Sequence, residues 1–367
     1  MKPVPAVFAL VLIFQYSHGL KDDASDLLAV AVLYRHGDIT PTQSFPTDPY
    51  FNIDYWPMGF GQLTEKGKLR QYRLGQWLRK RYSDFLPGLY NYSDIYVRSI
   101  DSDDALGSAE ANLAGLYPPI KIEDAVLPQC VPIHASPTGE DQVLYMTRPC
   151  PKFDRLYEEV KQSEYFASIN KNYSDFYEEV SNLTGWQIDD VDYFFSLQVA
   201  LNVYANVAPE YLPSWYQDLD KDKVQYLAGL SYARYSFTPE LKRLRVGPFF
   251  DYLHHQFNNT VMNEFSYDTS SKFLMMVSHS STLSSVLNGL GLFDYKQPDF
   301  GSALIWEVRK GQDDEYYVSI FYRRNAEEEP ELMEIPDCGT NCEYSKYMYK
   351  VESVKLDDWD IECQDQE

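Results

Sequence analysis

The feature that most constrains the fold of this 367-residue chain is a continuous apolar run at residues 27–33, LLAVAVL, which breaks off at a polar segment, residues 34–37, YRHG. An unbroken apolar run without alternation is typical of a strand buried on both faces, as strands in a mainly parallel α/β sheet are. Such a strand needs helices on both sides of its sheet. The run therefore predicts an α/β protein with a three-layer core.

The rest of the chain repeats this strand-to-helix pattern. Thr64 caps an amphipathic helix that ends in the basic residues 79–81. A short strand at residues 95–97 delivers Arg98 and is followed by a second helix, and a strand at residues 272–277 is followed by a third. We therefore expect three βα units in one sheet.

Two segments depart from that pattern. Residues 304–309 and 316–322 alternate in polarity around a polar turn, which predicts an antiparallel hairpin at the sheet edge. Residues 121–245 contain few strand-like runs and many aromatic and acidic residues, which predicts an inserted, mostly helical cap. The α/β core is then expected in two parts, residues 20–120 and 246–367.

The N-terminus predicts export. An apolar run at residues 4–14 follows Lys2 and precedes small residues, which indicates a secretory signal peptide at residues 1–19 rather than a membrane span. No second segment is long enough to cross a bilayer, so we expect a secreted, extracellular protein without a membrane partner. Four glycosylation sequons are consistent with export: Asn91, Asn172, Asn182 and Asn258.

The net charge of −23 excludes one class of partner. A chain with 55 acidic and 32 basic residues would repel a phosphate backbone, so nucleic acid is not expected as a ligand, whereas small cations would be attracted. The 31 tyrosines add aromatic faces that bind cations, although most of them are expected in the core or on the surface. The composition therefore favours a small aromatic cation as the ligand.

The five cysteines fit an oxidising compartment, but an odd number cannot all pair within one chain. Cys338 and Cys342 are close enough for a small disulfide loop, and a metal site is the weaker alternative because no histidine or second cysteine pair flanks them. His254 and His255 would point about 100° apart on a helix. We therefore expect no metal and no cofactor.

Polar residues follow three of the predicted strands: Arg35 and His36, then Arg98, then His279. Ligands of open α/β sheets bind outside the carboxyl ends of the strands, so these side chains can converge. An imidazole that attacks phosphorus, with guanidinium groups that neutralise the phosphate oxygens, would suit phosphoryl transfer. Each motif on its own is more often a loop without a catalytic role.

Further motifs accompany these residues at residues 34–38 (YRHGD), 59–64 (GFGQLT), 96–99 (YVRS) and 112–114 (NLA). Together they resemble the histidine acid phosphatases of the secreted and lysosomal type, over nearly the whole mature chain. The resemblance implies an α/β core with a helical cap. It also implies that a nucleophilic histidine becomes phosphorylated on nitrogen, with two arginines and a second histidine around the phosphate.

Several residues take on roles through this resemblance. His36 stands at the nucleophile position, and Arg35, Arg98 and His279 stand around the phosphate. The resemblance also implies two disulfides and one unpaired thiol: Cys150–Cys363, Cys338–Cys342 and Cys130.

Three positions depart from the family pattern. The family reads Arg-His-Gly-x-Arg-x-Pro, where this sequence has Ile39 for the second arginine, and it has an aspartic acid as proton donor where this sequence has Ser280. The family also has an Asp-x-Asp-Arg segment, and this sequence has Asp104 in place of its arginine. Losing a general acid costs on the order of 10²- to 10⁴-fold in rate, and losing a charge-stabilising donor about 10²- to 10³-fold. We therefore predict a protein with little or no acid phosphatase activity.

An exported phosphatase scaffold with these replacements is similar to the salivary acid phosphatase-like proteins of blood-feeding fleas. That resemblance implies a salivary protein that sequesters host mediators, namely biogenic amines such as serotonin and also lipid leukotrienes, in the former active-site cleft. Carboxylates would pair with an amine and retained arginines with a leukotriene; Asp38 is equally suited to orienting its loop. The expected ligand-binding residues are Arg35, His36, Asp38, Arg98, Asp104, Arg148, His279 and Ser280.

Two other interpretations stay open at this point. A weakly active acid phosphomonoesterase would still use His36 as its nucleophile, with another group supplying the proton. A secreted glycoprotein with no small ligand is the third. Titration with amines separates the first interpretation from the third, and a phosphatase assay separates it from the second.

Overall fold

The structure is a computed structural model that describes residues 26–146, 148–261, 271–356 and 358–364. The predicted signal peptide, residues 1–19, lies outside the described residues. No helix within the described ranges is long and apolar enough to cross a membrane.

The core is one mixed eight-stranded sheet in which the apolar run near the N-terminus forms a central strand, β1 (Asp26–Arg35). The strand order is β10-β8-β7-β1-β6-β2-β5, and β9 pairs with β8. The β1–β6, β6–β2 and β2–β5 pairs are parallel, whereas the pairs on the other side of β1 are antiparallel. The other strands of this sheet are β2 Ile95–Ile100, β5 His134–Ser136, β6 Phe273–Ser278, β7 Ala303–Lys310, β8 Tyr316–Arg323, β9 Glu331–Leu332 and β10 Cys342–Glu343.

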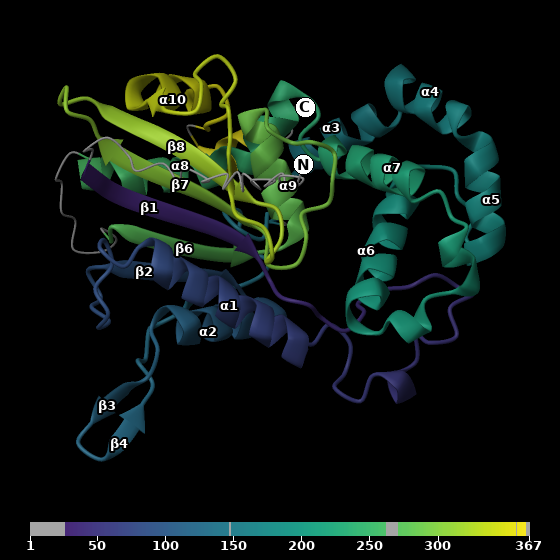
Figure 1. The fold of residues 1–367 in the computed structure, drawn as a ribbon. Coiled ribbons are helices and arrows are strands. Elements are labelled where there is room, and N and C mark those ends of the chain that lie inside the picture. The colour runs from purple at the N-terminus through teal and green to yellow at the C-terminus, as the bar shows by residue number, and fades with distance from the viewer. Residues whose placement is uncertain (1–25, 147, 262–270, 357, 365–367) are drawn as a thin grey trace, which may run out of the picture.

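Helices cover both faces of this sheet, which confirms the predicted three-layer core (Figure 1). α1 and α2 lie on one face, and α8, α9 and α10 lie on the other. As predicted, Thr64 caps α1, accepting a hydrogen bond from the N–H of Gly67. α1 and α2 can pack closely because Gly75 has no side chain. A Cβ at this position would lie only 1.9 Å from the carbonyl oxygen of Asn112. The bounds are α1 Glu65–Arg81, α2 Asp103–Leu116, α8 Pro239–Val261, α9 Ser280–Leu290 and α10 Tyr344–Glu352.

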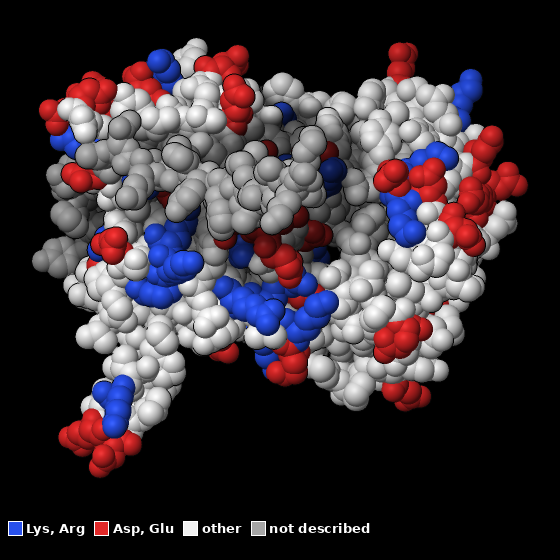
Figure 2. Space-filling model, in the orientation of Figure 1, with Lys and Arg blue, Asp and Glu red and all other residues white. Residues whose placement is uncertain are grey.

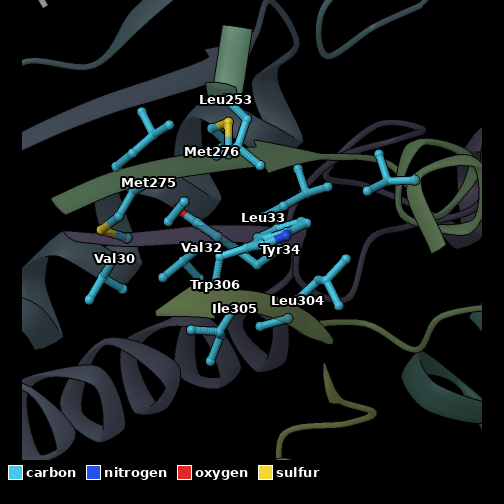
Figure 3. Packing of buried hydrophobic residues seen from close by; sticks show 14 of the residues in the cluster. Val30, Val32, Leu33, Tyr34, Leu253, Met275, Met276, Leu304, Ile305 and Trp306 are labelled. Carbon is cyan, nitrogen blue, oxygen red and sulfur yellow. The ribbon is translucent and has the colours of Figure 1, made fainter. Parts of the chain in front are cut away.

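The main hydrophobic core lies between these layers. Figure 3 shows side chains of β1, among them Val32 and Tyr34, packed with Met275 and Met276 of β6 and with Trp306 of β7. All six residues of β6 are buried, as are seven of the ten residues of β1. The continuous apolar runs in the sequence thus correspond to strands covered on both faces.

Two details differ from the predictions. The strand expected at residues 95–97 continues to Ile100, because β2 pairs with β6 over residues 95–99 and with β5 over residues 98–100. Arg98 therefore lies inside the strand rather than after it. The predicted hairpin forms as β7 and β8, but its expected position at the sheet edge is wrong. β7 pairs with β1, and β8 pairs with β9 and β10.

The inserted segment contains a helical unit with its own hydrophobic core, centred on residues such as Phe166, Phe194 and Leu227. Phe45, from the first part of the core, packs into it. This unit starts at α3 rather than at residue 121, because β5 joins the main sheet beside β2. Its helices are α3 Pro151–Lys161, α4 Glu164–Asn172, α5 Ser174–Thr184, α6 Asp192–Val207 and α7 Lys221–Arg234. The described ranges also contain three short 3₁₀ helices: Ile53–Tyr55, between β1 and α1, and Pro209–Tyr211 and Ser214–Gln217, between α6 and α7.

A short antiparallel hairpin, β3 (Ile120–Ile122) and β4 (Ala125–Leu127), projects from the body near α2 (Figure 1). The C-terminal helix α11 (Trp359–Glu362) is tied to the segment before α3 by the disulfide Cys150–Cys363. Cys338 pairs with Cys342, and Cys130 is free and exposed. Both disulfides that the family resemblance implied are therefore present.

Charged side chains are unevenly distributed over the surface. Figure 2 shows acidic groups scattered over the visible face, whereas lysine and arginine side chains gather near α1. Although the chain as a whole has a net charge of −23, positive side chains are concentrated near α1 on this face.

Candidate functional site

Two histidines meet one carboxylate at the carboxyl ends of the parallel strands. His36 follows β1, His279 follows β6, and Asp104 lies in the first turn of α2, just after β2. Asp104 Oδ2 lies 3.6 Å from His36 Nδ1 and 4.0 Å from His279 Nε2. The ring centroids of the two histidines are 5.4 Å apart. The topology thus brings these three predicted residues together, and we call them the His-Asp-His cluster.

The loop that carries His36 is fixed against α1 and α2. A Cβ at Gly37 would lie 2.5 Å from the carbonyl oxygen of Gly67, so only glycine allows the loop to approach α1 this closely. The N–H of Gly37 donates to Ser108 Oγ at 3.0 Å. His36 Nδ1 lies 2.8 Å from the Gly37 carbonyl oxygen, which can only accept. Nδ1 therefore carries the proton, and Nε2 keeps its lone pair.

The protonation states make the cluster anionic at neutral pH. Burial lowers the pKa of His36 to about 4, although Asp104 attracts the proton, and burial also lowers the pKa of His279. Burial opposes the charge of Asp104, but His36 and His279, once protonated at acid pH, hold the pKa of its carboxyl below the ordinary value. Both imidazoles are then neutral and the carboxylate is charged, so the three side chains together carry one negative charge.

The cluster opens to solvent at one end. His36 is 3% exposed and Asp104 is 7% exposed, whereas the side chain of His279 is 31% exposed. The ring of Tyr145 lies edge-on to His279 with centroids 5.4 Å apart, and Phe300 lies 5.7 Å from His36. A ligand that enters beside His279 therefore meets aromatic rings before it reaches the carboxylate.

Arg35 is a cation that interacts electrostatically with His36 and Asp104. Its Nη1 donates to the carbonyl oxygen of Pro298 at 2.7 Å, and the guanidinium lies 3.9 Å from the ring centroid of Phe300. Arg35 is buried, and burial lowers its pKa. Its Nε has no hydrogen-bond partner among the described residues.

Asp38, expected as an alternative counter-ion, is already neutralised. Its carboxylate is buried and accepts hydrogen bonds from Arg70 Nε at 2.6 Å and Arg70 Nη2 at 3.3 Å. Lys66 Nζ lies 3.8 Å away. Asp38 therefore ties the His36 loop to α1 and offers no free charge to a ligand.

The two other predicted arginines make their contacts elsewhere. Arg98 Nη2 donates to Asp141 Oδ1 at 2.9 Å and to Ser136 Oγ at 3.3 Å, because its position inside β2 aims it across the neighbouring strand β5. Arg148 pairs with Asp360 at 2.6 Å, and its guanidinium lies 4.7 Å from the ring centroid of Trp359. Sequence position alone does not show these partners.

The two replaced positions other than Asp104 carry no charge into the site. Ile39 is 6% exposed and packs with Leu63, Val203 and Phe300 in a small apolar cluster. Ser280, the first residue of α9, places its Oγ 3.0 Å from the hydroxyl of Tyr232. Gln297 Nε2 in turn donates to that hydroxyl at 2.7 Å.

Sequence reasoning missed several residues around the cluster. Tyr145, Tyr232, Gln297 and Phe300 lie in segments without a recognisable motif, and their types are common in this chain. Only their distance in space from the two histidines identifies them. No local pattern would have separated these two tyrosines from the others.

The cluster also has the residue types of a metal site. His36, Asp104 and His279 each offer a ligand atom, and these atoms lie within 4.8 Å of one another. Bonds of about 2 Å in a tetrahedral zinc site would place ligand atoms roughly 3.3 Å apart, so the cluster would have to contract around a metal. A larger organic cation needs no such contraction. The expectation that the protein binds no metal stays a prediction.

Comparison with known proteins places this site in a family. Residues 26–323 match the family described as the histidine phosphatase superfamily (branch 2). Prostatic acid phosphatase of Bos taurus is 35% identical over 347 residues, which cover 93% of this chain and 88% of that protein. Lysosomal acid phosphatase of Homo sapiens is 32% identical over 354 residues, which cover 93% of this chain and 81% of that protein.

The fold is also found among solved structures. A Hafnia alvei phytase in complex with tartrate matches with a TM-score of 0.72 at 17% identity, covering 94% of this chain and 100% of that chain. A phytase from Citrobacter braakii matches with a TM-score of 0.69 at 16% identity, covering 92% of this chain and 99% of that chain. At these identities the similarity concerns the fold alone.

Proposed function

Because the chain belongs to branch 2 of the histidine phosphatase superfamily, we propose that it is an exported member that has exchanged phosphate hydrolysis for the binding of small aromatic amines. We place it with the salivary acid phosphatase-like proteins of blood-feeding fleas, which it resembles at Ile39 and Ser280. Serotonin and related biogenic amines are the proposed ligands.

The observation that carries this proposal is the carboxylate of Asp104 between two neutral imidazoles. Two unit charges 4 Å apart interact by about 4 kcal/mol at an effective dielectric constant of 20. Because Asp104 stands where the family has an arginine, its interaction with a charged ligand has about this size and the opposite sign. A phosphate anion is then repelled at the point where an ammonium group is attracted.

The proposal also rests on the lack of a suitable proton donor at the cluster. The Ser280 hydroxyl, which is paired with Tyr232, is a far weaker acid than a carboxyl group. Asp104 is ionised, because its pKa is held below the ordinary value by His36 and His279 against the effect of burial. An alkoxide leaving group would therefore receive no proton from either residue.

An aromatic amine has complementary partners here. Its ammonium would donate to Asp104, and its ring would lie against Tyr145 and His279, which border the exposed end of the cluster. The lone pair of His36 Nε2 offers a further acceptor. Lipid leukotrienes have less support in this site, because Arg35 is the one predicted arginine that contacts it.

The proposal is tested by titration calorimetry and by a phosphatase assay. The secreted protein is titrated at pH 7.4 with serotonin, noradrenaline, histamine and a leukotriene. A stoichiometric scavenger needs a dissociation constant below about 1 μM, which corresponds to roughly −8 kcal/mol. If no amine gives binding heat, amine binding is refuted. If the protein hydrolyses p-nitrophenyl phosphate at acid pH as fast as an ordinary acid phosphatase, the loss of hydrolysis is refuted.

Two observations favour a second candidate, a weakly active acid phosphomonoesterase. His36 keeps a lone pair on Nε2, as a nucleophile requires, and burial raises the pKa of the Asp299 carboxyl near Arg35. Asp299 would then be the proton donor. Trapping a phosphorylated His36, together with loss of slow turnover in Asp299→Asn, would support this candidate over the first.

A further inference from the structure

A cavity lies apart from the His-Asp-His cluster, at the junction of α3, α8 and α11. Its volume is about 370 Å³, and its lining includes Met146, Arg148, Phe153, Leu244, Arg245 and Trp359. We propose that this cavity, here named the α3–α8–α11 cavity, binds a small organic monocarboxylate with an apolar body. The proposal goes beyond amine binding, since no residue of the His-Asp-His cluster lines this cavity.

Arg245 is the central observation. It is 8% exposed, yet no carboxylate pairs with it within the described parts of the chain. Its Nη1 donates to the carbonyl oxygen of Met146, and its Nε has no partner among the described residues. Its guanidinium lies 5.1 Å from the ring centroid of Tyr235. A buried cation without a counter-charge is costly, and an anionic ligand would supply that charge.

A neighbouring helix carries a buried guanidinium that acidic side chains neutralise. Arg234 is fully buried and pairs with Asp190 at 2.8 Å and with Asp192 at 3.0 Å. Two carboxylates therefore neutralise it inside the protein. At Arg245 no acidic side chain of the described residues forms an ion pair, and the guanidinium borders a cavity instead.

A second guanidinium borders the same cavity. Arg148 pairs with Asp360, but the Asp360 side chain is 65% exposed, so this ion pair is worth little and can be exchanged. The side chain of Arg148 is itself 32% exposed. Arg148 is therefore placed to meet an anion that enters from solvent, and Arg245 to meet it inside.

The remaining lining selects the body and the charge of the ligand. Phe153, Leu244 and Trp359 pack together with the Cys150–Cys363 disulfide, which fixes one wall. These side chains suit an aromatic or short aliphatic body. Asp154 also borders the cavity, so a monoanion fits better than a phosphate dianion.

The test uses three probes of equal shape and different charge. Calorimetry at pH 7 and low salt compares 3-phenylpropionate with 3-phenylpropan-1-ol and 3-phenylpropylamine on the full-length secreted protein. We expect the carboxylate to bind with one-to-one stoichiometry and at least tenfold more tightly than the alcohol. Equal binding of the carboxylate and the alcohol, or no heat from the carboxylate at millimolar concentration, would overturn the proposal.

Matched variants on α8 separate a ligand from a structural role of Arg245. Arg245→Gln should weaken 3-phenylpropionate binding at least tenfold, because a hydrogen bond to a charged group contributes about 1.5–3 kcal/mol. Arg243→Gln, on the same helix but paired with Glu362, should leave binding unchanged. Equal weakening by both variants would refute a specific site. Arg148→Gln, at a half-buried position, provides a second variant and should weaken binding severalfold.

The two proposals fail separately. Arg245→Gln should bind serotonin as the wild type does, and Asp104→Asn should bind 3-phenylpropionate as the wild type does. If serotonin does not bind at all, the carboxylate titration still decides the fate of the α3–α8–α11 cavity. Thermal melting of each variant shows whether a lost signal reflects lost folding.

Discussion

Replacing Asp104 by asparagine gives the sharpest test of the His-Asp-His cluster. Asparagine keeps the size of the side chain and an oxygen that can accept from Ser102 Oγ, which lies 2.6 Å from Asp104 Oδ1. The charge alone is removed. Among the described residues, no basic residue pairs with the carboxylate apart from the two neutral histidines, so its charge is available to a ligand that enters beside the partly exposed His279.

The expected loss follows from the contact that an ammonium group would make. The Coulomb interaction at 4 Å is about 4 kcal/mol at an effective dielectric constant of 20, which is an upper value for a site that is open at His279. Hydrogen bonds to charged groups contribute about 1.5–3 kcal/mol. We therefore expect Asp104→Asn to weaken serotonin binding by roughly 10- to 150-fold.

The assay is calorimetry at pH 7.4 with Asp103→Asn as the control. Asp103 precedes Asp104 in the first turn of α2 but is exposed, so its removal makes the same change of net charge without touching the cluster. The control should bind like the wild type. Binding by Asp104→Asn within threefold of the wild type, or equal losses in both variants, would refute the assignment of Asp104 as counter-ion.

Three further predictions follow from the same geometry. The triple variant Ile39→Arg, Asp104→Arg, Ser280→Asp should raise p-nitrophenyl phosphate hydrolysis at pH 5 at least 100-fold over the wild type, measured by release of p-nitrophenol, because it returns two cations and a proton donor to the site. Amine affinity should stay constant between pH 8 and 7 and fall as the pH drops toward 4, because burial lowers the pKa of His36 and of His279 and protonated imidazoles would repel an ammonium group. The free energy of unfolding should also fall with pH, from the unfolded-state histidine pKa near 6.5 down to about 4, because the unfolded state takes up these protons first. Urea titrations at several pH values should show a less steep fall in His36→Gln than in the wild type. Removing the Cys150–Cys363 disulfide, which joins residues 213 positions apart, should lower the free energy of unfolding by about 2–5 kcal/mol in urea titrations, whereas serine at the free Cys130 should change it by less than about 0.5 kcal/mol.

The parts of the fold that the sequence predicts are those determined by local pattern. The apolar runs at β1 and β6 become strands buried on both faces, and Thr64 begins α1 as a capping residue does. The position of the β7–β8 hairpin is not a local property. β7 pairs with β1 from a distant part of the chain, and only the assembled sheet shows this.

The same distinction separates the site residues. The sequence predicts that His36 and His279 converge with Arg35 and Arg98, because the ends of neighbouring parallel strands meet at one edge of the sheet. Asp104, predicted only as a counter-ion, lies between the two histidines there. Whether a charge is free at that edge depends on partners that are remote in sequence. Asp38 is neutralised by Arg70, which lies 32 residues away on α1, and Arg98 by Asp141, which lies 43 residues away.

The Asp141–Met146 segment connects the two proposed sites. Asp141 Oδ1 accepts from the N–H groups of Val143 and Leu144 as well as from Arg98, so the arginine expected at the phosphate instead fixes this turn. Tyr145 then faces His279, and the carbonyl oxygen of Met146 accepts from Arg245. One fixed turn therefore presents a ring to the anionic cluster and a carbonyl group to the cationic cavity. Because the cluster centres on a carboxylate and the cavity on a guanidinium, we expect an ammonium group and a carboxylate to prefer different sites.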